Sequence, residues 1–171
     1  PALVMVNPVM TGFSAIRHLR RISPVPIMGH FAGIAALGRL PWFGVHSAVF
    51  SKLMRVAGAD LVGIAGFGPR MQTADAEVLR NVAACLEPMG SIAPALPIPG
   101  GGDWAGTLPE VYAKIGHSDF GFISGRGVFG HPDGPAAGAR SLLQAWEAVR
   151  NGFRLEEYAK KHSELKRALE T

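Results

Sequence analysis

The chain has 171 residues, of which 48% are hydrophobic, 18% charged and 8% aromatic, and its formal net charge is +4. This composition is typical of one globular domain with a sizeable core. No apolar run approaches the ~18 residues of a membrane-spanning helix, so we expect no membrane partner. The single cysteine, Cys85, excludes an internal disulfide and favours a reducing, cytoplasmic setting.

The basic charge is concentrated in the first third of the chain. Residues 1–59 contain six basic side chains and no acidic one. Arg17, Arg20 and Arg21 share one face at helical spacing, which is typical of a solvated surface. Basic surfaces that bind nucleic acid usually carry interleaved aromatic residues or a known module, and neither is present. We therefore expect no nucleic-acid partner.

Short apolar runs alternate with segments of helical periodicity along the chain. The runs predict strands at 3–8, 25–30, 60–66, 94–102 and 119–127. The periodic segments predict helices at 13–21, 32–40, 45–56, 75–86, 107–116 and 136–150, and one last helix from about 155 to 169. Thr107 and Glu110 have the spacing of a capping box, with Pro109 in the first turn.

Three of these helices have an apolar face. The face of the helix at 45–56 consists of Val45, Ala48, Val49, Leu53 and Val56. In the helix at 75–86, the residues predicted to point inward are Val78, Leu79, Val82 and Leu86. The last helix has Tyr158, Ala159, His162, Leu165 and Leu169 on one face. Such stripes normally pack against a sheet or another helix.

Continuous apolar strands that alternate with helices predict a parallel sheet of the α/β class. Such a chain forms either a doubly wound sheet or part of a (β/α)₈ TIM barrel. Glycine clusters follow the last two strands, where barrels commonly hold phosphate, whereas a nucleotide-binding sheet has its glycine loop after the first strand. The pattern favours a barrel, in which these would be about strands four to eight plus C-terminal helices. Residues 1–171 would then be the C-terminal part of the barrel domain, with an N-terminal domain and the first strands outside this sequence.

The glycines at these two strand ends predict a phosphate site. Without a Cβ, Gly101, Gly102, Gly125 and Gly127 allow backbone N–H groups to point at a phosphate. Glycines also form ordinary turns between strands and helices, and that alternative remains open. "GRGVFG" at 125–130 matches the dinucleotide-binding motif, but no ribose-binding acid follows ~20 residues later.

The order of motifs resembles the RuBisCO large-chain superfamily over the whole chain. Residues 123–139, "ISGRGVFGHPDGPAAGA", resemble the last-strand motif F-G-G-G-T-L-G-H-P-x-G-x-x-x-G-A, and "PGGG" at 99–102 resembles its S-G-G. "TGFSA" at 11–15 and "GVHSAVFSKLMRVAGAD" at 44–60 resemble two further family segments. The resemblance implies a first phosphate at Gly102, Arg126 and Gly127, with Gly101, Ser124 and Gly125 in the same two turns.

The departures from the family pattern lie at the other end of the substrate. In family carboxylases the second phosphate is held by an arginine, a histidine and a serine, and here those positions are Phe31, Gly63 and Gly100. A phosphate at this end would lose several charge-assisted bonds of ~1.5–3 kcal/mol each. The mobile-loop lysine of carboxylases is replaced by Arg70, which can clamp a carboxylate or phosphate but cannot donate a proton as lysine does.

The remaining candidates lie at strand ends. His30 is at the position of the family's strand-five histidine, where we expect it to move a proton or bind a substrate hydroxyl; a core or capping histidine is the alternative. Asn7 ends the first strand of this chain and either touches substrate or caps the strand. His46, His131 and Cys85 are expected to be structural.

The resemblance implies a RuBisCO-like enzyme that acts on a phosphorylated keto-sugar or keto-acid through an enolate, by enolisation, isomerisation or decarboxylation, and does not fix CO₂. It also implies Mg²⁺, whose lysine, aspartate and glutamate ligands would lie outside this sequence, and a homodimer or an assembly of dimers. Two alternatives remain open at this stage: a genuine ribulose-1,5-bisphosphate carboxylase, and a non-catalytic barrel that binds a phosphate ligand.

Overall fold

A computed structural model describes residues 2–40 and 42–170. The chain forms two compact units, which we describe one at a time. The first unit comprises Pro1–Pro99 and Asp119–Gly121, and the second comprises Gly100–Ser118 and Phe122–Thr171. None of the helices in the described residues combines the length and the apolar character needed to cross a membrane.

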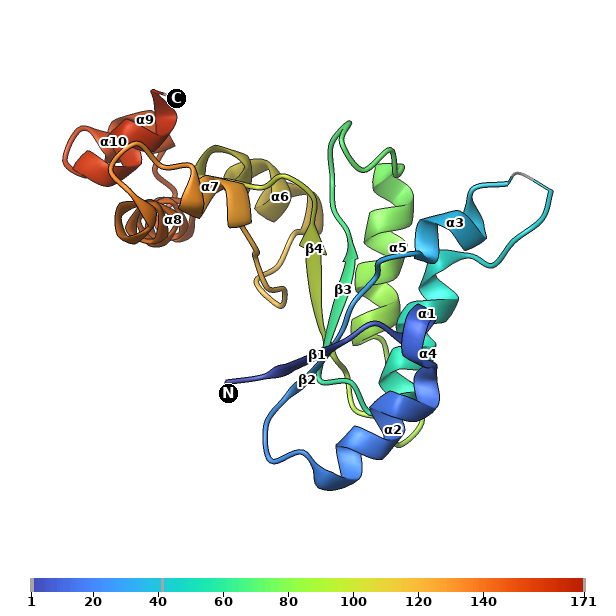
Figure 1. The fold of residues 1–171 in the computed structure, drawn as a ribbon. Coiled ribbons are helices and arrows are strands. Elements are labelled where there is room, and N and C mark those ends of the chain that lie inside the picture. The colour runs from blue at the N-terminus through green and yellow to red at the C-terminus, as the bar shows by residue number, and fades with distance from the viewer. Residues whose placement is uncertain (1, 41, 171) are drawn as a thin grey trace. The chain divides into compact units, whose positions relative to one another are not determined.

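The first unit is built on a twisted sheet of four strands (Figure 1). In chain and spatial order these are β1 (Val4–Val6), β2 (Ile27–Gly29), β3 (Leu61–Ala65) and β4 (Leu96–Gly100). β1 pairs with β2 in parallel, with Val4 opposite Ile27, and β2 pairs with β3 in parallel, with Met28 opposite Leu61. The parallel α/β class predicted from the alternation of strands and helices is confirmed.

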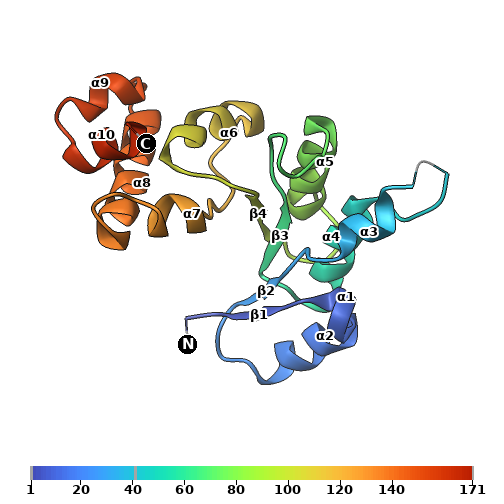
Figure 2. The same cartoon turned by 45° about the horizontal axis from the view of Figure 1, so that its top comes forward.

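The helices of the first unit pack on one face of this sheet, as Figures 1 and 2 show for α2, α4 and α5. They are α1 (Pro8–Thr11), α2 (Phe13–Ile22), α3 (Ile34–Gly38), α4 (Ser47–Ala57) and α5 (Asp75–Leu86). The α4 bounds have local causes: the His46 ring accepts a hydrogen bond from the Ala48 N–H, and Gly58 ends the helix at φ 102°. A parallel sheet with its helices on one face is the arrangement of a segment of a barrel wall.

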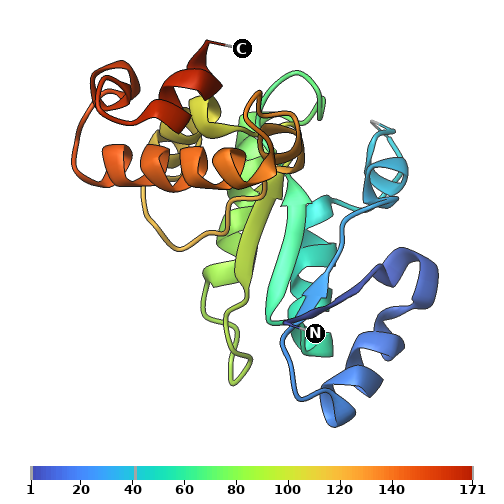
Figure 3. The ribbon, with the colours of Figure 1, turned by 60° about the vertical axis from the view of Figure 1, so that its left-hand side comes forward.

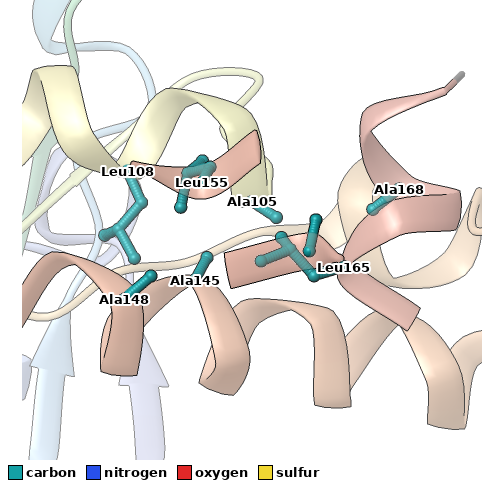
Figure 4. Close-up of a cluster of buried hydrophobic side chains, with 8 residues drawn as sticks. Ala105, Leu108, Ala145, Ala148, Leu155, Leu165 and Ala168 are labelled. Atoms are coloured by element: carbon teal, nitrogen blue, oxygen red, sulfur yellow. The ribbon is translucent and has the colours of Figure 1, made fainter. Parts of the chain in front are cut away.

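The second unit is mainly helical (Figure 3). It contains a 3₁₀ turn, η1 (Ala105–Thr107), and α6 (Leu108–Ile115), α7 (Gly125–Phe129), α8 (Pro135–Arg150), α9 (Leu155–Ala159) and α10 (Ser163–Leu169). Its core is a cluster of small and branched side chains, drawn in Figure 4. Ala145 and Ala148 of α8 face Leu155 of α9 and Leu165 of α10, and the alanines allow these helices to approach closely.

The strand predicted at 119–127 is wrong, because these residues form irregular backbone followed by α7. The reason lies in β4. Leu96 donates its N–H to the Asp60 carbonyl, on the side of β4 that faces β3. Because N–H groups alternate between the two edges of a strand, the nitrogens of Pro97 and Pro99 lie on the opposite edge, where a fifth strand would need donors. Neither proline has an N–H, and the described residues show one bond there, from Gly121 N–H to the Pro97 carbonyl (2.9 Å).

The single helix predicted over 155–169 is two helices, α9 and α10. The chain breaks at Lys160–His162, where the His162 ring stacks on Tyr158 at 3.9 Å and bonds the Tyr158 carbonyl. The Gln144 side chain of α8 accepts a hydrogen bond from the Leu165 N–H. Side chains thus satisfy the backbone groups that a continuous helix would have paired.

Three smaller predictions are also wrong. Of the apolar face predicted for α4, Val49, Leu53 and Val56 are solvent-exposed, as is Val45 before the helix, and only Ala48 is buried; Phe50, Met54 and Ala57 are buried instead. In α5, Leu79 is exposed, although Val78 and Val82 are buried as predicted. Thr107 does not cap α6, since its hydroxyl accepts from the Trp104 N–H and closes η1 instead.

Candidate active site

The first glycine turn follows β4 in the second unit and is organised by Asp103. Gly102 has φ 108°, which favours glycine. The buried Asp103 carboxylate accepts a hydrogen bond from the Gly101 N–H at 3.0 Å, and its second oxygen lies 3.4 Å from the Thr107 hydroxyl. The prediction that the Gly101 N–H faces a phosphate therefore does not hold in this structure. The Gly102 N–H has no hydrogen-bond partner among the described residues.

The second glycine turn is tied to the first by one hydrogen bond. The buried Ser124 donates its hydroxyl to the Asp103 carbonyl at 2.6 Å. Gly125 then begins α7, and its N–H also lacks a partner within the described part of the chain. The side chain of Arg126 is exposed and supplies the positive charge of this turn.

The glycines of these two segments differ in how much space a side chain would have at each position. A Cβ on Gly127 would come within 2.7 Å of the Trp104 Cβ, so close packing requires glycine there. A Cβ on Gly100 or Gly125 would meet nothing within 4 Å. Close packing in α7 thus explains Gly127, whereas Gly100 and Gly125 leave open space beside bare backbone.

A cavity of about 300 Å³ lies beside the two turns, within the second unit. Its lining includes Gly102, Trp104, Arg126, Gly127, His131 and Ala168. His131 is buried, and its Nε2 lies 3.0 Å from the Glu164 carbonyl while its Nδ1 accepts from the Asp133 N–H. Nε2 is the ring nitrogen placed to donate to that carbonyl. An anion in this cavity would meet backbone N–H groups and the Arg126 guanidinium.

In the first unit, His30 and Phe31 lie together after β2. Their rings stack at 5.1 Å, and the Nδ1 of His30 accepts a hydrogen bond from the Ala32 N–H at 3.0 Å. The proton of the neutral ring is therefore on Nε2, which has no partner among the described residues. His30 is half-buried, so this Nε2 can exchange a proton with a ligand.

Phe31 fills the space that a side chain on Gly63 would need. A Cβ placed on Gly63 would lie 3.3 Å from Phe31 Cδ1 and 3.2 Å from the Met28 methyl. A cavity of about 80 Å³ adjoins these residues, lined also by Arg39, Ser47, Glu77 and Asn81. Apolar atoms thus occupy the position where the family pattern has a histidine.

Arg70 and Asn7 also belong to the first unit. Arg70 is exposed in the loop between β3 and α5, and it makes no hydrogen bond or ion pair to any described residue. The Asn7 side chain accepts a hydrogen bond from the Val9 N–H at 3.0 Å and caps the helix α1, whereas the alternative stated for it was a cap of the strand. His46 caps α4. Burial raises the pKa of the Cys85 thiol to about 12, which makes it an unreactive core residue.

Sequence reasoning missed Asp103. The glycines of "PGGGDW" drew attention to backbone approach, but the acid directly after them is the residue that the Gly101 N–H binds. An acid within two residues of a turn glycine is a recognisable signal, because Asp side chains commonly bond nearby backbone N–H groups.

Comparison with known proteins gives consistent relatives. The model of the ribulose bisphosphate carboxylase large chain, catalytic domain, matches residues 1–171. A ribulose bisphosphate carboxylase-like protein of Allochromatium vinosum is 57% identical over 97% of the chain and 36% of its own length. A 3-oxo-isoapionate-4-phosphate decarboxylase of Rhizobium etli is 35% identical over 96% of the chain and 39% of its own length.

Among solved structures, the octameric ribulose-1,5-bisphosphate carboxylase/oxygenase of Pyrococcus horikoshii OT3 has a TM-score of 0.92 and is 33% identical over 99% of the chain. The chain covers 41% of that structure. The chain thus spans about two-fifths of the length of the proteins it matches.

Proposed function

The chain belongs to the family of the RuBisCO large-chain catalytic domain, and from that premise we propose that the protein is a RuBisCO-like enzyme that does not fix CO₂. Its substrate would be a keto-sugar or keto-acid with a single phosphate, processed through an enolate by enolisation, isomerisation or decarboxylation. The observation that carries this proposal is that Phe31 and Met28 both lie against Gly63 and fill the space of a side chain there. A dianionic phosphate placed there would be desolvated by apolar atoms and would lack the arginine, histidine and serine that the family pattern has at positions 31, 63 and 100, which is unfavourable.

The remaining phosphate would bind at the glycine turns of the second unit. The unpaired N–H groups of Gly102 and Gly125 and the guanidinium of Arg126 are the donors for it. In the first unit, the His30 Nε2 would move the proton of the enolisation, and Arg70 would clamp a carboxylate or carbonyl oxygen.

The family implies Mg²⁺, which would supply charge stabilisation of the enolate oxygens. Among the described residues, no three His, Cys, Asp or Glu side chains lie close enough to hold a metal ion. These residues therefore do not fit a magnesium centre, and we derive no step through it; the proposal puts the ligands outside this chain. It also includes a cytoplasmic homodimer or an assembly of dimers, for which the octameric relative is support.

The two alternatives predict different chemistry. A genuine carboxylase needs the second phosphate site, which Phe31, Gly63 and Gly100 do not provide. A non-catalytic phosphate-binding barrel would not use His30, and the decarboxylase among the relatives supports an enzyme. No specific observation in the structure favours either alternative.

Solvent exchange tests the enolate directly. The protein at its full natural length is incubated in D₂O with monophosphorylated keto-sugars, and deuterium at the carbon next to the carbonyl is followed by NMR. We expect exchange or turnover with the wild type and a loss of about 10²–10⁴-fold in His30→Ala. Equal exchange rates in His30→Ala and the wild type would show that His30 does not move the proton. If the wild type neither exchanges nor converts any phosphorylated ketone, the result favours the non-catalytic alternative.

A further inference from the structure

Asp103 joins the two glycine turns through both its side chain and its backbone. Its carboxylate accepts a hydrogen bond from the Gly101 N–H at 3.0 Å, and its backbone carbonyl accepts one from the Ser124 hydroxyl at 2.6 Å. Both Asp103 and Ser124 are buried, so water does not compete for these bonds. The two turns are therefore fixed to each other before any ligand arrives.

The same residue stands in the chain between Gly102 and Trp104, which both line the cavity of the proposed anion site. Gly102, whose N–H is a proposed phosphate donor, lines this cavity together with Arg126. A buried carboxylate and a nearby bound dianion repel each other when little water screens them. Protonation of the carboxylate would remove this repulsion.

The groups around Asp103 make its protonation the simplest outcome. Thr107 on η1 faces its carboxylate with a neutral hydroxyl, and Ser124 before α7 donates its hydroxyl to the backbone carbonyl of Asp103. The adjoining cavity is lined by Arg126 of α7, by His131 before α8 and by Ala168 of α10. Both ring nitrogens of His131 already have partners, the Glu164 carbonyl and the Asp133 N–H.

The protonation energetics agree with this geometry. Burial raises the pKa of Asp103, and the hydrogen bonds from Gly101 and Thr107 oppose that rise. Among the described residues, no cation contributes to holding the carboxylate in its charged form. A dianion beside it would raise its pKa further.

Resting on the proposed function, we propose that Asp103 is a positioning residue of the phosphate site and that an anion binds there together with one proton, which Asp103 takes up. The protonated side chain keeps one oxygen on the Gly101 N–H, and its O–H is free to donate to the anion or to Thr107. Affinity for a dianion therefore rises as the pH falls through the pKa of Asp103 in the bound state.

Sulfate is the probe, because it stays a dianion over the whole range and its own protonation does not interfere. Calorimetric titration of the full-length protein at about pH 6, in two buffers of different ionisation enthalpy, gives the number of protons taken up per sulfate. The variants are Asp103→Asn, which keeps an acceptor for the Gly101 N–H, and Glu156→Gln, an exposed acid of α9, as the matched control.

We expect measurable proton uptake in the wild type and in Glu156→Gln, and little in Asp103→Asn. At neutral pH, Asp103→Asn should bind sulfate about fivefold or more tightly than the wild type, and the two should converge at acidic pH. Equal proton uptake in Asp103→Asn and the wild type would overturn the inference while leaving the phosphate site intact. A wild type that binds no sulfate at any pH would instead contradict the phosphate site of the proposed function.

Ser124→Ala keeps the inference testable if Asp103→Asn does not fold. It removes the hydroxyl that ties the turns but retains the carboxylate. We expect weaker sulfate binding with unchanged proton uptake. Unchanged affinity would contradict the positioning role, and lost uptake would contradict the assignment of the proton to Asp103.

Discussion

At the scale of single residues, the glycines separate into those that packing requires and those that it does not. Gly127→Ala would place a methyl group against Trp104, and we expect a loss of about 1–3 kcal/mol in unfolding free energy. Gly125→Ala is the matched control, because a Cβ there meets nothing within 4 Å. Chemical denaturation of both variants measures the difference. Equal stability of the two would contradict the packing explanation for Gly127.

Cys85 provides a second test at this scale. Burial raises the pKa of its thiol to about 12, so almost no thiolate exists at neutral or mildly alkaline pH. We expect no alkylation by a thiol-specific reagent at about pH 8 in the folded protein and rapid alkylation in denaturant. Mass spectrometry of the peptide that contains Cys85 gives the result, and fast labelling without denaturant would show that the thiol is accessible.

At the scale of elements, Glu164 holds α10 to α8. The Gln144 amide and the Arg140 guanidinium bond its carboxylate at 2.8 and 2.7 Å and keep its pKa at about 2, below the ordinary 4.5. Because the folded-state pKa is lowered, the stabilisation is complete above about pH 4.5 and is lost as the pH falls toward 2.

We therefore expect Glu164→Gln to melt at a lower temperature than the wild type at neutral pH, with the difference shrinking as the pH falls below about 4.5. Thermal melts at several pH values measure this, with Glu156→Gln as the control, which should follow the wild type. A difference that is the same at pH 3 and at pH 7 would assign the effect to packing rather than to charge.

The elements also show where the sequence is informative. Apolar periodicity predicts the helix α5 with its observed bounds, Asp75–Leu86. A long amphipathic pattern that begins with acidic residues is typical of a helix and of no other element. It fails at 119–127, where the prolines of the neighbouring strand, not the segment itself, remove the donors for pairing. It also fails at α4, since an apolar stripe does not say which of two faces is buried.

For the candidate site, the sequence predicts which residues take part but not how they are bonded. The glycine clusters point to both turns, yet a pattern of glycines does not show that the Asp103 carboxylate accepts a hydrogen bond from the Gly101 N–H. The loss of the second phosphate site stays a prediction, which depends on the residue types of Phe31, Gly63 and Gly100. The position of Phe31 and Met28 against Gly63 is visible only in the structure.

At the scale of the whole molecule, the chain spans about two-fifths of the length of the relatives it matches. Its parallel strands and one-sided helices fit part of a barrel wall, and the matched family is that of a barrel enzyme. Activity at this scale depends on residues beyond those described, so it must be measured on the full-length protein. Restoring one residue should not restore carboxylation: Phe31→Arg leaves Gly63 and Gly100 without their partners.

The central claim is that this protein handles a substrate with one phosphate and does not fix CO₂. The direct measurement is incorporation of labelled CO₂ with ribulose-1,5-bisphosphate, beside turnover of monophosphorylated keto-sugars and keto-acids by the same full-length preparation with Mg²⁺. The account predicts turnover or solvent exchange with monophosphates and no incorporation with the bisphosphate, since Phe31 and Gly63 provide no cation for the second phosphate. Steady incorporation of CO₂ into products of ribulose-1,5-bisphosphate would contradict it.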